Sequence, residues 1–236
     1  MSIKKCAEMA IIYALVVSGF LAAAWFGSRT VTVMAQRAES NLAPVIVIDA
    51  GHGGEDGGAV SCTGVLEKEL NLQIALRLDD LFHLLGYRTR MVRTTDLSVY
   101  TAGDTIAQRK ASDLKARVQL VEKLSSPVLV SIHQNLYPDA RYSGAQVFFD
   151  PPGKGRELAE ALQTAFRDTI NSGSRREIKK AEGIYLMEHI SCPAILVECG
   201  FLSNPEEETL LRSEKYQKNI CIIISTAVAE FLDART

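Results

Sequence analysis

Three apolar runs in this sequence each end in a residue that can bind a metal ion or carry a proton. "VIVIDAGH" leads to His52, "VLVSIH" to His133 and "AILVE" to Glu198. Histidine nitrogen and carboxylate oxygen are ligands for zinc, and a catalytic zinc site uses three protein ligands and keeps one open position. A carboxylate beside such a site could take a proton from water and return it. The pattern indicates metal-assisted hydrolysis.

Glu67 is the third candidate ligand, because it starts the helical segment "EKELNLQIALRLDDLFHLLG" after the first histidine. A glutamate there would also suit the helix dipole, so a structural role is the alternative. A single histidine at a strand end is more often a satisfied polar residue than a ligand. Glu198 is harder to explain without chemistry, because an unpaired carboxylate on a buried strand is costly. We expect His83 and His189 to be structural or surface residues.

The glycine-rich loop "GHGGEDGG" around His52 could also suggest a nucleotide site. A dinucleotide loop opens directly into a helix, and a phosphate loop ends in G-K-[ST]. This loop continues into "AVSCTGV" and has neither feature. We therefore expect the glycines to let the backbone turn sharply and come close to another group beside His52. Asp49, just before the loop, would either orient a metal ligand or start the turn with its side chain.

Short strands alternate with amphipathic helices along the rest of the chain. The expected strands are "VIVID", "YRTRMVR", "PVLVSIH", "GAQVFFD", "GIYLM" and "PAILVE". The expected helices are "EKELNLQIALRLDDLFHLLG", stopped by Gly86, "DTIAQRKASDLKARVQLVEKL", "GKGRELAEALQTAFRDTIN" and "EKYQKNICIIISTAVAEFLDA". Fully apolar strands predict an α/β fold with a mostly parallel central sheet and helices on both faces. Functional residues in such sheets gather beyond the carboxyl ends of the strands.

The N-terminus has a different character. Lys4 and Lys5 precede an uncharged stretch, residues 9–27, that is about long enough to span a bilayer. We expect a membrane anchor or signal segment over residues 1–30, a tether over 31–44 and a catalytic domain over 45–236. "VMA" at residues 33–35 offers a cleavage site. With or without cleavage, the catalytic part would be exported, to act outside the cytoplasm.

Composition and charge exclude some classes of function. The chain is 47% hydrophobic and 23% charged, with a net charge of −2, so it has a real core and no global basic field. No long basic tract is present, and we expect no nucleic-acid binding. The cysteines Cys62, Cys192, Cys199 and Cys221 follow no metal spacing. Two of them could form a disulfide in an exported domain, although we expect Cys199 and Cys221 to be small buried hydrophobic residues.

Four separated motifs, "VIVIDAGHGGEDGG", "GVLEKELNL", "VSIHQN" and "AILVECGFLSNPEE", together resemble the zinc-dependent N-acetylmuramoyl-L-alanine amidases. The resemblance implies that His52, Glu67 and His133 bind Zn²⁺ and that Glu198 is the general base and acid. It implies a peptidoglycan substrate, with contacts to the glycan strand and the stem peptide.

"RKASDLKARVQLVEK", "SGAQVFF" and "EGIYLMEH" resemble the germination-specific branch, which helps to make muramic-δ-lactam in the spore cortex. Gln134 departs from the small or apolar residue common after the second histidine, and could alter the substrate groove. Two alternatives stay open: a catalytically silent or partner-activated peptidoglycan-binding protein, and a zinc carboxypeptidase that acts on the stem peptide.

Overall fold

The computed structural model describes residues 15–19, 21–25 and 44–235. The chain divides into two compact units, Met1–Asn41 and Leu42–Thr236. All of the candidate site residues belong to the second unit. None of the helices within the described ranges is both long and apolar enough to cross a membrane. The anchor or signal expected over residues 1–30 and the tether over 31–44 fall mostly outside the described residues.

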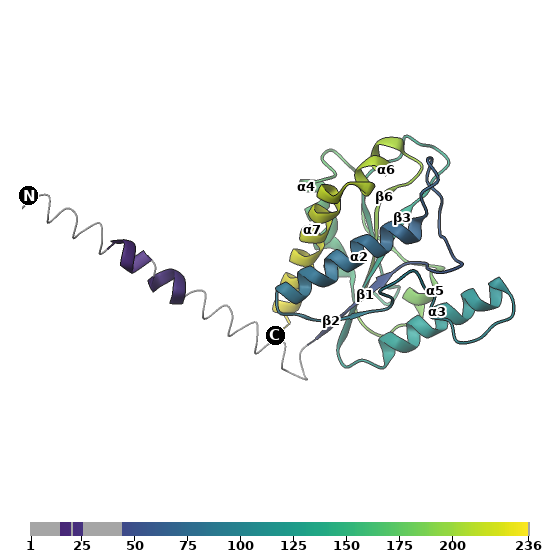
Figure 1. The fold of residues 1–236 in the computed structure, drawn as a ribbon, viewed down its shortest axis with the longest axis horizontal. Helices are drawn as coiled ribbons and strands as arrows, with labels where there is room; N and C mark the ends of the chain where they lie inside the picture. The colour runs from purple at the N-terminus through teal and green to yellow at the C-terminus, as the bar shows by residue number, and fades with distance from the viewer. Residues whose placement is uncertain (1–14, 20, 26–43, 236) are drawn as a thin grey trace, which may run out of the picture. The chain divides into compact units, whose positions relative to one another are not determined.

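A six-stranded sheet forms the centre of the second unit, in the order β2-β1-β3-β6-β4-β5 (Figure 1). Its strands are β1 (Val45–Ala50), β2 (Arg88–Met91), β3 (Pro127–Asn135), β4 (Gln146–Phe149), β5 (Lys179–Lys180) and β6 (Ala194–Phe201). The first four in sheet order are parallel to one another. β4 runs antiparallel to β6, and β5 follows the direction of β4. The predicted α/β fold with a mostly parallel sheet is confirmed.

Helices cover both faces of this sheet. They are α2 (Glu67–Leu84), α3 (Ile106–Glu122), α4 (Arg156–Asp168), α5 (Tyr185–Glu188), α6 (Pro205–Arg212) and α7 (Glu214–Asp233). Residues that alternate along a strand point to opposite faces, so each face of β1 has its own core. Ile46 and Ile48 pack with α2, α4 and α7, whereas Val47 packs with α3 and α5 (Figure 1).

Local sequence explains the end of α2 and the start of α3. Gly86, in the left-handed conformation at φ +79°, follows the end of α2. Thr105 caps α3, because its side chain accepts the Gln108 N–H while the Gln108 side chain bonds back to it.

The strand predicted for "GIYLM" is wrong. Gly183, at φ +76°, turns the chain, and α5 follows as a single helical turn. The neighbours Leu186 and Met187 are both buried, which a helical turn allows and a strand with alternating faces does not. The strand of this region is instead β5, two exposed lysines that the sequence did not indicate.

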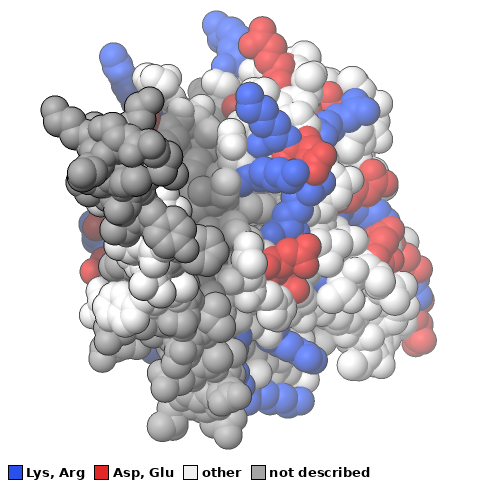
Figure 2. Space-filling model, turned by 60° about the vertical axis from the view of Figure 1, so that its left-hand side comes forward, with Lys and Arg blue, Asp and Glu red and all other residues white. Residues whose placement is uncertain are grey.

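Charged side chains are mixed on the surface. On the face in Figure 2, basic and acidic side chains are interspersed, so this face carries no continuous region of one sign. That distribution fits a chain whose net charge is −2.

Candidate active site

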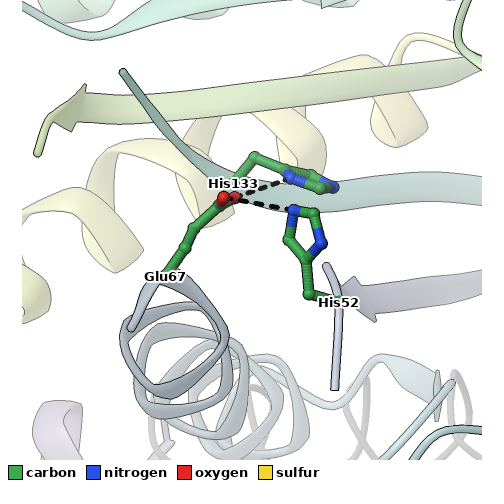
Figure 3. Close-up of side chains that lie close together, drawn as sticks. All are labelled: His52, Glu67 and His133. Atoms are coloured by element: carbon green, nitrogen blue, oxygen red, sulfur yellow. Dashed lines mark hydrogen bonds and ion pairs between the residues drawn. The ribbon is translucent and has the colours of Figure 1, made fainter. Parts of the chain in front are cut away.

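His52, Glu67 and His133 come together at the carboxyl edge of the parallel strands (Figure 3). His52 follows β1, Glu67 is the first residue of α2, and His133 lies near the end of β3. One ligand atom from each lies within 4.8 Å of the others. Glu67 Oε2 is 3.1 Å from His52 Nε2, and Glu67 Oε1 is 2.9 Å from His133 Nδ1. Two nitrogens and a carboxylate are a donor set that suits zinc.

Glu67 is surrounded by hydrogen-bond donors. Its Oε2 accepts the Ala59 N–H at 2.9 Å, and its Oε1 accepts the Gln134 N–H at 3.1 Å and Asn71 Nδ2 at 3.2 Å. Burial raises the pKa of Glu67, but its hydrogen bonds with the two histidines lower it by more, so the pKa lies well below its usual range. The buried side chain is therefore an ionised carboxylate, the form that binds a metal.

His52 is held by partners on both sides of its ring. Nδ1 is 2.9 Å from Asp56 Oδ2, and Lys110 Nζ lies 3.1 Å from the same oxygen. A donor bond from Nδ1 to Asp56 leaves Nε2 to face Glu67, which fixes the tautomer that a metal ligand needs. Burial lowers the pKa of His52, but the bonds to Glu67 and Asp56 raise it by more. Zinc and a proton therefore compete for this ring.

The backbone at His52 is strained. Its φ is +61°, a left-handed conformation that is uncommon for residues other than glycine. Three buried cations bind carbonyl groups around it. They are Arg93, which donates to Ala50 and Gly51 at 2.9 Å each, Arg117, which donates to His52 at 2.7 Å, and Lys68, which donates to Gly54 at 2.7 Å. These contacts hold the loop in the conformation that presents the His52 ring.

Two glycines of the loop leave room for the ligands. A Cβ atom at Gly51 would lie 2.3 Å from Cε1 and Nε2 of His133. At Gly58, where φ is +68°, a Cβ would lie 2.6 Å from Glu67 Oε2. No real Cβ contact is that short, so the expected role of the glycines in close approach is confirmed at these two positions.

Of the two roles expected for Asp49, the structure favours orienting a ligand through a second residue, because within residues 44–235 its carboxylate bonds to Arg117 and Ser131 and not to the turn. Its buried carboxylate pairs with Arg117 and accepts a hydrogen bond from Ser131 Oγ at 2.7 Å. It therefore acts on His52 indirectly, because Arg117 also binds the His52 carbonyl. Burial raises the pKa of Asp49, but Arg117 and Ser131 lower it by more, and the carboxyl stays ionised.

Glu198 stands beside the three-residue group in a different environment. It pairs in register with His133 on the neighbouring strand, which puts both side chains on one face of the sheet. Its Oε2 is buried and has no hydrogen-bond partner among the described residues. Burial raises the pKa of Glu198 to about 7. β3 and β6 both continue past these residues, so His133 and Glu198 lie within strands rather than at their last positions.

A cavity of about 200 Å³ connects these groups. His52, His133 and Glu198 line one part of it, and Leu186 and Met187 of α5 form an apolar wall. Sequence reasoning missed this wall, because it placed a strand there.

Asp56, Lys110 and Arg117 also line the cavity, and sequence reasoning did not single them out. The signal for the last two was their spacing of seven residues, which places them on one face of the predicted helix. Asp56 gave a weaker signal, an acidic residue four positions after His52.

The other residues singled out from the sequence lie away from the cavity. His83 and His189 are exposed, as predicted. Gln134 is buried, donates to Asn71 Oδ1 at 3.1 Å and is not among the residues that line the cavity. The four cysteines within the described residues are free, with Cys62 exposed and the other three buried.

The fold and the site define an α/β enzyme with a candidate His–Glu–His metal centre and a buried glutamate beside it. The profile of the N-acetylmuramoyl-L-alanine amidase family matches residues 46–230, and the chain belongs to this family. Its enzyme class is therefore that of an amidase acting on peptidoglycan.

Three individual relatives show which members of the family this chain resembles. The germination-specific N-acetylmuramoyl-L-alanine amidase of Bacillus subtilis (strain 168) is 36% identical over 189 residues, which cover 79% of this chain and 79% of the relative. The CwlD amidase from Clostridioides difficile, solved in complex with the GerS lipoprotein, is 34% identical with a TM-score of 0.77, covering 80% of this chain and 98% of that one. The N-acetylmuramoyl-L-alanine amidase from Clostridium difficile 630 is 32% identical with a TM-score of 0.72, covering 83% and 100%. The resemblance to the germination-specific branch is confirmed.

Proposed function

We propose that this protein uses Zn²⁺ to hydrolyse the amide bond between N-acetylmuramic acid and L-alanine. His52, Glu67 and His133 would hold the ion, and Glu198 would transfer the proton. The observation that carries the proposal is the Oε2 atom of Glu198. It is a buried carboxyl oxygen without a hydrogen-bond partner in residues 44–235, and its side chain lines the same cavity as the two histidines. A purely structural glutamate would be expected to have found a hydrogen bond.

Bound zinc would supply Lewis-acid activation of the amide carbonyl and of water. Glu198, with a pKa of about 7, can accept a proton at Oε2 from the attacking water and deliver it to the leaving alanine nitrogen. Asp56 and Arg117 hold His52 in place through its ring and its carbonyl group. Leu186 and Met187 of α5 give the cavity an apolar lining.

The biological role we propose follows from the relatives. The protein would act outside the cytoplasm, in the formation of muramic-δ-lactam in the spore cortex. The N-terminal segment, residues 9–27, would anchor or export the domain, which spans residues 45–236. A protein partner could activate the enzyme, as the solved complex of CwlD with GerS suggests.

The experiment compares the wild type with Glu198→Gln on purified peptidoglycan with zinc, with the products identified by mass spectrometry. The isosteric amide cannot accept the proton, so we expect turnover to fall by about 10²–10⁴-fold while zinc stays bound. Glu69→Gln, an exposed glutamate on α2, is the matched control and should behave as the wild type does.

Each alternative gives a different product. The amidase releases intact stem peptides that begin at L-alanine, whereas a carboxypeptidase shortens the stem from its other end. A silent binding protein changes no fragment. Wild-type turnover by Glu198→Gln would refute the role of that residue, and full zinc occupancy in His52→Ala would refute the proposed ligand set.

A further inference from the structure

A second hollow lies outside the catalytic cavity. It has a volume of about 530 Å³ and is lined by two loop segments, residues 139–143 and 174–176, and we call it the arginine groove. Arg141, Arg175 and Arg176 contribute cations, and Asp139 is the one acidic residue among its lining residues. The groove is thus basic on a chain whose net charge is −2.

The groove lies at the same edge of the sheet as the catalytic residues. The segment 139–143 connects β3 to β4, and the segment 174–176 comes just before β5. β4 is antiparallel to β6, so it begins where β3 and β6 end. Gln146, the first residue of β4, pairs in register with Glu198. Arg176 donates to Gln146 Oε1 at 2.8 Å, which connects the groove to the strand position beside Glu198.

The guanidinium groups of the arginine groove remain accessible to an anionic ligand. Arg175 is exposed and has no ion-pair partner in residues 44–235. Arg141 is paired with Asp139 through Nε and Nη2 at 2.7–3.1 Å, but its side chain is 91% exposed, so an anionic ligand can reach it and compete with Asp139. Arg176 donates to neutral acceptors, Gln146 Oε1 and the Ser143 carbonyl, with Glu207 as the nearby carboxylate. Guanidinium groups bind carboxylates through two parallel hydrogen bonds.

Aromatic side chains border the cations. Tyr142 lines the groove and is 47% exposed. Its ring lies 4.6 Å from that of Tyr137, and 6.2 Å from that of Phe201. Arg176 lies 4.4 Å above the Phe201 ring, which fixes this corner of the groove. An exposed tyrosine ring offers an apolar face and a polar hydroxyl, which suits the mixed surface of a sugar.

We propose that the arginine groove binds a neighbouring segment of the peptidoglycan strand, beyond the muramic acid whose amide bond is cleaved. Arg141 and Arg175 bind a carboxylate of an adjacent stem peptide, and Tyr142 contacts a sugar ring. This inference rests on the proposed function, because it takes peptidoglycan as the substrate. The groove lies at the same edge of the sheet as the cavity of about 200 Å³, and the carboxylates of the polymer complement the charge of the groove.

The test compares the full-length wild type with Arg141→Ala/Arg175→Ala on two substrates. One is polymeric peptidoglycan stripped of phosphate-containing wall polymers, and the other is a soluble muramoyl peptide with a single sugar. The matched control is Arg90→Ala/Lys123→Ala, which removes two exposed cations without ion-pair partners in the described part of the chain. We expect KM for the polymer to rise about tenfold in the groove variant, the effect of roughly one lost contact. Its kcat for the polymer and its turnover of the small substrate should match the wild type.

Equal KM values for the polymer in the groove variant and the wild type would overturn the inference. An equal loss on both substrates would do the same, because it would indicate a disturbed catalytic site. A zinc-loaded wild type that cleaves neither substrate would count against hydrolysis by the unaided chain and leave a partner-activated enzyme or a binding protein. Sedimentation with the stripped polymer then decides the groove separately: the groove variant should pellet less than the control variant, and equal pelleting overturns it. Weaker pelleting seen only with unstripped walls would assign the groove to a phosphate polymer and also overturn the proposal.

Discussion

Replacing Arg117 with methionine would remove the cation that joins the sheet to the loop that carries His52. Arg117 and Asp49 form a buried ion pair, with side chains 3% and 2% exposed. The variant leaves the Asp49 carboxylate buried with Ser131 as its only hydrogen-bond donor, and the His52 carbonyl loses its 2.7 Å bond. Removing one partner of a buried pair costs about 3–5 kcal/mol, so we expect the free energy of unfolding to fall by that amount.

Urea denaturation in the presence of a chelator measures this loss without a contribution from bound metal. Zinc titration of the folded variant measures the second effect, which we expect to be a loss of affinity of about 10–100-fold through the displaced loop. Arg156→Met is the control, because Arg156 and Glu160 form an exposed pair, with side chains 63% and 53% exposed. It should cost under about 1 kcal/mol.

The double variant Asp49→Asn/Arg117→Met tests the cause of the loss. It removes both charges of the Asp49–Arg117 pair, so it should be more stable than Arg117→Met alone, although both variants also lose the 2.6 Å bond from Arg117 to Asp113. The reasoning is refuted if Arg117→Met costs no more than the exposed control. It is also refuted if the double variant is as unstable as the sum of the two single ones, since that result would mean that the charges do not interact.

Three further outcomes are expected. The pKa of Asp49 is lowered in the folded state. Its contribution to stability is therefore complete above the ordinary pKa of 3.8 and is lost as pH falls through the folded pKa. The difference in unfolding free energy between the wild type and Asp49→Asn should shrink in that acidic range. A constant difference down to full acid unfolding would contradict this. His133→Ala should lose zinc in a metal assay, whereas His83→Ala, at an exposed position, should keep it; retention by both would exclude His133 as a ligand. Gly51→Ala should reduce zinc affinity, because its Cβ would lie 2.3 Å from the His133 ring. Gly57→Ala is the control and should bind zinc normally, because its Cβ would meet Leu66 at 3.4 Å. Equal zinc affinities of the two variants would show that the ring can move aside.

The sequence predicted the sheet and the grouping of the site because both depend on local patterns. Apolar runs define β1, β3 and β6, and parallel strands bring their carboxyl ends to one edge. His52, Glu67 and His133 were therefore expected to meet, and the structure brings them together. Their roles as zinc ligands stay predictions until a metal is measured.

What the sequence did not predict depends on long-range contacts. The pairing of Asp49 with Arg117 joins residues 68 positions apart, and Arg117 looked like an ordinary charged residue of an amphipathic helix. α5 was mistaken for a strand, because five residues are too few for hydrophobic periodicity to separate the two structures. The unpredicted ion pair and the unpredicted helix both lie around the candidate metal site, where tertiary packing decides the geometry.

Two glutamates of this site have opposite protonation behaviour because the fold gives them opposite surroundings. Glu67, at the start of α2, accepts bonds from two backbone N–H groups, from Asn71 and from both histidines, which keep it ionised. Glu198 lies on β6 beside His133, with an oxygen that no donor reaches, and burial raises its pKa to about 7. A permanently ionised carboxylate suits a ligand, and one that titrates near neutrality suits a proton carrier. The assignment of roles therefore follows from the number of donors around each carboxylate.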